Sequence, residues 1–176
     1  MPVVWITGSP GTGKSRVLEA LVARGFIAFD ADKGIARWRD RSSGEAVWAP
    51  PARTRPATWH RDFTRRLERD RVQEIIENAG DSIASLCGVV ENDAELWDLF
   101  AKVVYLVLDE APLRDRLLAR TTNDYGKEPS QLVGTLRRNA SFEAKYRSIG
   151  AVMLDASQTV DSVVESILAT SRELAP

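Results

Sequence analysis

The sequence of 176 residues contains one cysteine, one histidine and no long apolar run. The single cysteine, Cys87, cannot form a disulfide within the chain, which is typical of a reducing compartment. His60 stands alone, so no Cys/His cluster has metal-ligand spacing and no zinc site is expected. No apolar stretch approaches the roughly 20 residues of a membrane span. A short strand pattern begins almost at the N-terminus, so we expect no signal peptide, no membrane partner and a cytoplasmic location.

The chain also lacks an excess of charge of either sign, because its formal net charge is −1. A protein without a basic surplus is a poor general binder of nucleic acid, so nucleic acid is an unlikely partner. Internal repeats and low-complexity tracts are missing as well. The length suits one compact domain, and we expect residues 1–176 to form it, as a monomer or a homodimer.

One motif is complete. Residues 8–15 read Gly-Ser-Pro-Gly-Thr-Gly-Lys-Ser, the spacing G-x-x-x-x-G-K-[ST] of a phosphate-binding loop. An apolar run at 3–6 precedes it and a helical pattern at 15–24 follows, so backbone N–H groups and a helix N-terminus converge on an anion. In this pattern the lysine reaches the β- and γ-phosphates of a nucleotide and the following hydroxyl binds Mg²⁺. We therefore predict a nucleotide site formed by Gly8, Ser9, Pro10, Gly11, Thr12, Gly13, Lys14 and Ser15.

Short apolar runs alternate with helical patterns along the chain, which predicts an α/β fold with a parallel sheet buried on both faces. The expected strands are 3–7, 26–30, 82–87, 103–108 and 151–155. One long helix is expected over 59–79, and shorter ones around Leu96–Phe100 and after Pro112. Ser130 is the expected N-cap of a further helix, and the last helix starts near Thr159.

In two segments the apolar residues follow neither the helical nor the strand period. Residues 38–58 contain three prolines and two tryptophans, and residues 121–129 are mostly polar. Long irregular segments in compact domains are usually functional or disordered. Ligands of open α/β sheets bind at the carboxyl ends of the strands, so we interpret 38–58 as an acceptor-covering segment and 121–129 as a lid.

These motifs resemble the small P-loop kinases: nucleoside monophosphate kinases, shikimate kinase and gluconate kinase. Asp30-Ala31-Asp32 resembles the Asp-x-Asp of shikimate kinase, and Arg116 to Arg120 resembles the R-x-x-x-R that leads into the lid of adenylate-type kinases. Asp155-Ala156-Ser157-Gln158 follows the last strand, where that group wraps the adenine. The resemblance implies a three-layer P-loop NTPase fold, with a five-stranded parallel sheet in the order 2-3-1-4-5, helices on both faces and a lid.

The sequence also departs from these families. The segment from Ser85 to Asn92 lacks the Asp-Gly-x-Pro-Arg-like turn of nucleoside monophosphate kinases, and the glycine triplet of shikimate kinase is missing. The acceptor pocket therefore follows neither pattern, although Cys87, Gly88, Glu91 and Asn92 are placed to line it.

The resemblance implies an ATP-dependent phosphotransferase that uses Mg²⁺ and acts on a hydroxyl or phosphate of a nucleoside, nucleotide or sugar-like alcohol. Lys14, Arg116 and Arg120 would neutralise the transferred group. We place Asp32 at the acceptor hydroxyl and Asp30, with Ser15, at the metal, although the two aspartates could exchange roles. Arg116 and Gln158 would contact the nucleotide.

Each of these assignments has an alternative. One aspartate could cap the next helix, and the two arginines could lie on a solvated helix face. The tryptophans at 38, 48 and 59 could stack on a ligand or simply pack in a core. Residues 53–71 hold seven arginines against three acids, which fits a site for an anionic acceptor, a site for a stretch of nucleic acid, or a solvated helix face. A nucleotide-dependent switch or a polynucleotide kinase is also open, whereas a GTPase would need an Asn-Lys-x-Asp motif that this sequence lacks.

Overall fold

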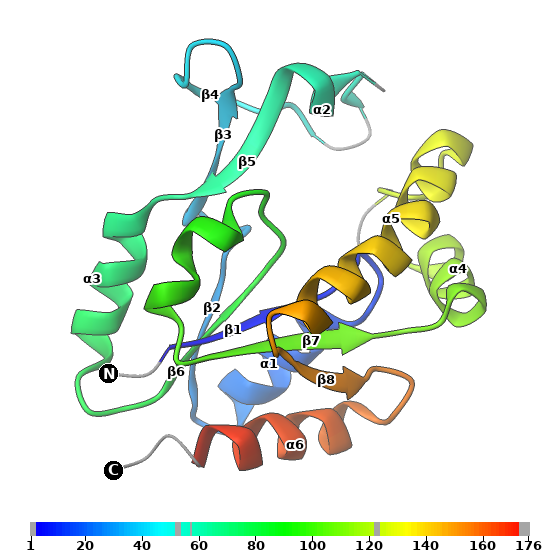
Figure 1. The fold of residues 1–176 in the computed structure, drawn as a ribbon. Helices are drawn as coiled ribbons and strands as arrows, with labels where there is room; N and C mark the ends of the chain where they lie inside the picture. The colour runs from blue at the N-terminus through cyan, green and yellow to red at the C-terminus, as the bar shows by residue number, and fades with distance from the viewer. Residues whose placement is uncertain (1–2, 52–53, 57, 122–123, 173–176) are drawn as a thin grey trace.

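The computed structural model describes residues 3–51, 54–56, 58–121 and 124–172. Its centre is a five-stranded, all-parallel sheet in the order β2-β6-β1-β7-β8 (Figure 1). The strands are β1 (Val3–Thr7), β2 (Ile27–Asp30), β6 (Ala84–Cys87), β7 (Lys102–Val107) and β8 (Val152–Asp155). Counted along the chain as parallel strands, this is the order 2-3-1-4-5, so the predicted topology is confirmed.

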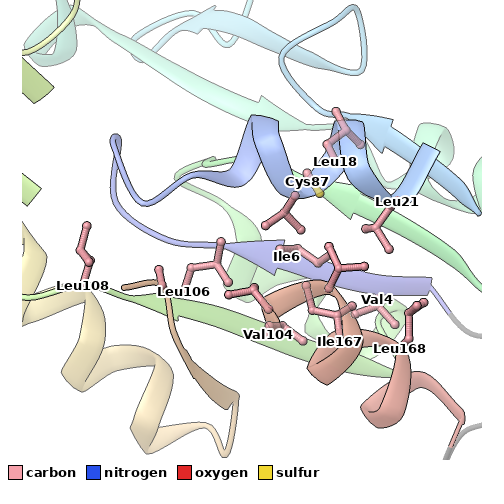
Figure 2. Close-up of a cluster of buried hydrophobic side chains, with 14 of the residues drawn as sticks. Val4, Ile6, Leu18, Leu21, Cys87, Val104, Leu106, Leu108, Ile167 and Leu168 are labelled. Atoms are coloured by element: carbon pink, nitrogen blue, oxygen red, sulfur yellow. The ribbon is translucent and has the colours of Figure 1, made fainter. Parts of the chain in front are cut away.

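Helices cover both faces of the sheet. The side chains on both sides of β1 are therefore buried. Val4 and Ile6 pack with α1 (Lys14–Ala23) and α6 (Val160–Arg172), as Figure 2 shows. Val3 and Trp5 pack on the opposite face with α3 (Arg69–Ala79) and the 3-10 helix η2 (Asp93–Leu99). All four of these β1 side chains are fully buried, which explains the unbroken apolar run in the sequence. The helices that flank the predicted lid are α4 (Glu110–Ala119) and α5 (Pro129–Ser148).

The single helix expected over 59–79 is wrong. The segment forms α2 (Trp59–Asp62), the strand β5 (Phe63–Leu67) and α3. β5 pairs antiparallel with β3 (Ala36–Asp40), and Glu68 has an extended backbone that separates the strand from α3. The pairing of β5 with β3 therefore decides the structure of residues 63–67, and it overrides the helical periodicity of the longer window.

The irregular segment 38–58 contains regular structure that the sequence did not indicate. β3 pairs with the short strand β4 (Ala46–Val47) as well as with β5, which gives a second, three-stranded antiparallel sheet in the order β4-β3-β5. Trp38 and Trp59 are buried and meet edge to face with ring centroids 5.7 Å apart, whereas Trp48 is 80% exposed. Trp38 on β3 therefore packs against Trp59 on α2, and this contact joins the small sheet to α2.

The remaining helix predictions need smaller corrections. The N-cap of α5 is Glu128 and not Ser130, because the Glu128 carboxylate accepts hydrogen bonds from the backbone N–H groups of Ser130 and Gln131 while Pro129 occupies the first turn. The helix around Leu96 is the 3-10 helix η2, and the last helix begins at Val160, next to the expected Thr159. Within the described residues, no helix has the length and apolar character needed to cross a membrane.

Candidate active site

The loop between β1 and α1 is shaped by glycines at positions where a side chain would clash or would strain the backbone. A Cβ atom on Gly8 would lie 2.9 Å from the carbonyl oxygen of Leu106 and 2.8 Å from Oγ1 of Thr12. Gly13 is the N-cap of α1 with a left-handed φ of 100°, and its lack of a side chain leaves the helix without a side-chain cap. The first turn of α1 carries no acidic residue either. The positive end of α1 is therefore open to an anion, which fits a phosphate group.

Lys14 lies across this loop. Its Nζ donates to the carbonyl oxygens of Gly8 and Ser9 at 2.7 and 3.0 Å. Burial lowers the pKa of Lys14 to about 8, although the nearby Asp32 carboxylate favours the charged form. An ammonium group so poorly solvated gains strongly from any anion placed beside it.

Three other predicted site residues share the electrostatic environment of Lys14. Asp30 and Asp32 come from the end of β2, and Arg120 from the end of α4. Cys87, at the end of β6, also lies near the lysine, but burial raises the pKa of its thiol to about 12. The carboxyl ends of parallel strands meet at one edge of a sheet, which is where open α/β folds bind ligands. The structure thus brings together side chains from four separate parts of the sequence.

The two aspartates differ in their contacts. Oδ1 of Asp30 accepts a hydrogen bond from the backbone N–H of Asp32 at 2.8 Å, which fixes the turn. Asp32 forms an ion pair with Nη1 of Arg65 at 2.8 Å. Burial raises the pKa of Asp32, and Arg65 opposes that shift. The turn leads into β3 and not into a helix, so the alternative that one aspartate caps the next helix is wrong.

Arg116 lies on the other side of the loop. Its Nη1 is 3.9 Å from the point that a Cβ on Gly13 would occupy. Gln158 donates from Nε2 to Oδ2 of Asp155 at 3.0 Å. Hydrogen bonds from Gln158 and Ser157 lower the pKa of Asp155, and the charge of Arg116 contributes. Arg116 therefore lies between the phosphate-binding loop and the turn after β8, and it is half-buried, which does not fit a fully solvated helix face.

Arg120 links α4 to the predicted lid. Its Nη2 donates to the carbonyl oxygen of Tyr125, and its guanidinium lies 5.9 Å from the centroid of the Tyr125 ring. Its Nε is buried without a hydrogen-bond partner within the described ranges. The part of 121–129 that is described packs against α4, since a Cβ on Gly126 would lie 3.0 Å from Leu117. Residues 122 and 123 of the predicted lid lie outside the described residues.

Several residues near the site were not assigned from the sequence. Arg65 falls within the helix predicted over 59–79, yet it lies on β5 and pairs with the candidate base Asp32. Asn92 was placed in the acceptor pocket, but its amide bonds both backbone groups of Leu67 at 2.9 Å and holds β5 in place. Glu91 pairs with Arg41. The residues of β5 read Phe-Thr-Arg-Arg-Leu, which has no regular alternation of apolar and polar side chains, so no local pattern placed Arg65 on a strand.

Comparison with known proteins agrees with this architecture. The sequence matches the AAA domain family over residues 4–146. No curated protein sequence matches the chain. A gluconokinase from Sinorhizobium meliloti 1021 has a similar structure, with a TM-score of 0.58 and 21% identity over 99% of this chain and 93% of that chain.

Two further structures have the same arrangement. A shikimate kinase from Acinetobacter baumannii, solved in complex with shikimate, gives a TM-score of 0.59 and 17% identity over 98% of this chain and 94% of that chain. A deoxyadenosine kinase from M. mycoides gives a TM-score of 0.52 and 13% identity over 98% and 99% of the respective chains. Identities this low establish a shared fold. With the family match over most of its length and an intact phosphate-binding loop, the chain belongs to the AAA domain family and has the fold of the small P-loop kinases.

Proposed function

We propose that this protein is an ATP-dependent phosphotransferase that moves the γ-phosphoryl group to a hydroxyl or phosphate of a small molecule. One observation carries the proposal: Lys14 of the phosphate-binding loop shares its surroundings with two aspartates from β2 and an arginine from α4. A phosphoryl-transfer site needs positive charge for the transferred group and a carboxylate for the acceptor and metal. Both are present at one edge of the sheet. A cytoplasmic location and a small-molecule partner belong to the same proposal.

The residues present fit a magnesium ion. The Ser15 hydroxyl lies in the first turn of α1, next to the open helix end, and Asp30 offers a carboxylate near Lys14. Oxygen ligands of this kind are the ones that Mg²⁺ prefers. Bound there, Mg²⁺ would neutralise part of the charge on the phosphate oxygens.

The other roles in phosphoryl transfer belong to side chains of the protein. Lys14 would hold the outer phosphates and stabilise the charge that develops during transfer. Arg116 and Arg120, which approach the loop from α4, would supply further positive charge. Asp32 would orient the acceptor hydroxyl and receive its proton. Gln158 and Arg116 would hold the nucleoside end, and closure of residues 121–129 would exclude water.

A coupled assay of ADP release over neutral sugars, polyols, nucleosides, nucleotides and sugar acids tests the proposal. Stimulation of ADP release by one acceptor class above the rate with water alone is the expected result. An ADP release rate that no acceptor changes, from protein that binds ATP, would point instead to a nucleotide-dependent switch.

Replacing Asp32 with asparagine is expected to lower kcat about 100- to 10,000-fold while the affinity for ATP changes little, because a general base supplies that range. Steady-state kinetics and calorimetric titration with an ATP analogue give the two quantities. Asp40→Asn is the matched control, since Asp40 caps the turn after β3 through Ser42 and Ser43 and should leave kcat unchanged. An equal loss of kcat and ATP affinity in D32N would assign Asp32 to the metal.

Nucleotide binding is expected to take up a proton above pH 8. The pKa of Lys14 is about 8 in the free protein, so about three quarters of the lysine is neutral at pH 8.5. A triphosphate beside the amine raises that pKa and recharges it, so affinity falls as pH rises through this range. Calorimetry at pH 8.5 in buffers of different ionisation enthalpy should show an uptake of roughly 0.5–0.8 proton, which vanishes at pH 6.5. In Lys14→Arg the uptake should vanish at both pH values, and uptake that persists in K14R would assign the proton to another group.

A further inference from the structure

A buried tyrosine that the proposed function does not use contacts the phosphate-binding loop. Tyr105 is 1% exposed and stands opposite Thr7 in the pairing of β7 with β1. Its neighbours Val104 and Leu106 pack on the face of the sheet that α1 covers, so its side chain points to the other face. The Tyr105 hydroxyl lies 3.5 Å from Oγ of Ser9. Among the residues that the structure describes, Ser9 alone offers this hydroxyl a hydrogen-bond partner.

The carbonyl oxygen of Ser9 accepts three hydrogen bonds within the loop. Nζ of Lys14 donates to it at 3.0 Å, and Thr12 donates from Oγ1 at 3.0 Å and from its backbone N–H at 3.2 Å. Ser9 and Thr12 are both buried, so little water competes for these bonds. A shift of Ser9 would therefore displace the amine of Lys14.

Tyr105 is itself held in one position. Its ring stacks on the Tyr146 ring, with centroids 4.7 Å apart and planes 25° from parallel. The Tyr146 hydroxyl donates to the carboxylate of Asp93, which also accepts a hydrogen bond from Nζ of Lys145 at 2.7 Å. Asp93 and both tyrosines are buried. A side chain fixed in this way loses little conformational freedom when it makes a further contact.

The chemistry of the phenol suits it to positioning. Burial raises the pKa of Tyr105, although the hydroxyl and the backbone N–H of Ser9 oppose that rise. The phenol therefore stays neutral at physiological pH, and it can both donate and accept a hydrogen bond. Hydrogen bonds around a reacting group are often long in the free protein and tighten in the complex. The contact between Tyr105 and Ser9 is therefore worth more when the loop closes around phosphates.

We propose that Tyr105 is a positioning residue of the nucleotide site. Its hydroxyl fixes Ser9, and the carbonyl oxygen of Ser9 fixes the amine of Lys14 where it receives the outer phosphates. Tyr146 and Asp93 hold the ring of Tyr105 in place. This inference rests on the nucleotide-binding part of the proposed function and is independent of the acceptor and of the transfer step.

Tyr105→Phe tests the contact, because it removes the hydroxyl and keeps the stacked ring. Calorimetric titration of the full chain with a non-hydrolysable ATP analogue and Mg²⁺ should show an affinity about 3- to 10-fold weaker, the range of one hydrogen bond. Ser171→Ala is the matched control, since it removes a buried hydroxyl that bonds the carbonyl oxygen of Ile167 within α6. Its affinity should equal that of the unchanged protein. An unchanged affinity in Y105F would overturn the proposal.

A double-mutant cycle with Lys14→Ala separates positioning of the lysine from a general loosening of the loop. If Tyr105 acts through Lys14, its hydroxyl has nothing left to position once the amine is gone. Y105F is then expected to change the affinity of the K14A protein by less than about twofold. The same loss in both backgrounds would mean that the hydroxyl acts independently of the lysine, which contradicts the proposal.

Ser9→Ala tests the same contact from the side of the loop. It removes the other hydroxyl of the pair, so it should weaken binding of the ATP analogue, and adding Y105F should weaken it by less than the two single losses combined. Fully additive losses would show that the two hydroxyls do not act on each other. Thermal unfolding of each variant verifies that the titrated protein is folded.

The outcomes keep this inference distinct from the proposed function. Weaker analogue binding in Y105F, in a protein that releases no ADP with any acceptor, keeps the positioning role and removes the kinase. Acceptor-stimulated ADP release with a KM for ATP that Y105F leaves unchanged keeps the kinase and overturns the positioning role. In an active enzyme, Y105F should raise KM for ATP while KM for the acceptor stays within about twofold, because the hydroxyl of Tyr105 acts on the loop alone.

Discussion

Replacing Lys14 with alanine is expected to lower the rate of phosphoryl transfer about 100- to 1,000-fold, the loss seen when one preorganised charge-stabilising donor is removed. Lys14 is the one side chain whose ammonium group bonds the carbonyl oxygens of the phosphate-binding loop at both Gly8 and Ser9 within the described residues. A group already desolvated and fixed in place needs little reorganisation to meet the charge of the transferred group. Initial rates of ADP release at saturating ATP and acceptor measure this effect.

The opposite end of α1 provides the control. Arg24 pairs with Asp161 and Glu165 on the surface of α6, so Arg24→Ala removes a cation from the same helix without touching the loop. Its rate is expected to match that of the unchanged protein. Turnover at the normal rate in K14A would contradict the role given to the lysine.

The second large effect concerns stability and comes from a buried carboxylate. Asp93, the first residue of η2, is completely buried. Its Oδ1 accepts a hydrogen bond from Nζ of Lys145 at 2.7 Å, and its Oδ2 accepts one from the hydroxyl of Tyr146. The Tyr146 ring stacks on Tyr105 with centroids 4.7 Å apart, and the Tyr105 hydroxyl lies 3.5 Å from Oγ of Ser9. Asp93 therefore joins η2 to α5, and Tyr146 and Tyr105 connect this pair to Ser9 of the phosphate-binding loop.

Asp93→Ala is expected to lower the free energy of unfolding by about 3 kcal/mol, the lower end of the cost of removing one partner of a buried ion pair. The lower end applies because Lys145 is half-buried and can turn its amine towards water, whereas the buried Tyr146 hydroxyl cannot. Total stabilities of about 5–15 kcal/mol make this a large fraction. Urea unfolding followed by circular dichroism measures the difference.

Two further variants make the stability test specific. Asp93→Asn keeps an oxygen acceptor and should recover part of the loss. Asp98→Ala, at the other end of η2, removes only an exposed pair with Arg69 and should leave the unfolding midpoint unchanged. An unfolding curve of D93A that coincides with that of D98A would show that the buried network contributes nothing.

The fold could be predicted from the sequence wherever local and long-range preferences agree. The runs that form β1, β6 and β7 are apolar because both faces of the sheet are covered, and α6 presents one apolar stripe. The small antiparallel sheet could not be predicted in the same way. β3 and β5 are separated by a proline-rich segment, and their pairing depends on contacts such as Trp38 with Trp59. The spacing of the arginines in 61–71 is compatible with a helix as well as with a strand. The pairing of β5 with β3 decides in favour of the strand.

The same contrast between local patterns and long-range contacts applies to the candidate site. Residues 8–15 could be predicted because their spacing encodes a backbone conformation that binds phosphate, and Asp30 and Asp32 because they follow a strand. Arg65 could not be assigned as the partner of Asp32, because it lies in the helix expected over 59–79 and reads as an ordinary surface charge. Its position arises from the antiparallel sheet, which brings β5 next to the turn after β2.

Calorimetric titration of the full chain with a non-hydrolysable ATP analogue in the presence of Mg²⁺ is the most direct test of the central claim, that residues 8–15 bind the phosphates of a nucleoside triphosphate. The account predicts saturable one-to-one binding that depends on Mg²⁺ and is weakened at least about tenfold in K14A, as expected for a lost charge-assisted contact. Folded protein that takes up neither the ATP analogue nor its GTP counterpart would contradict it.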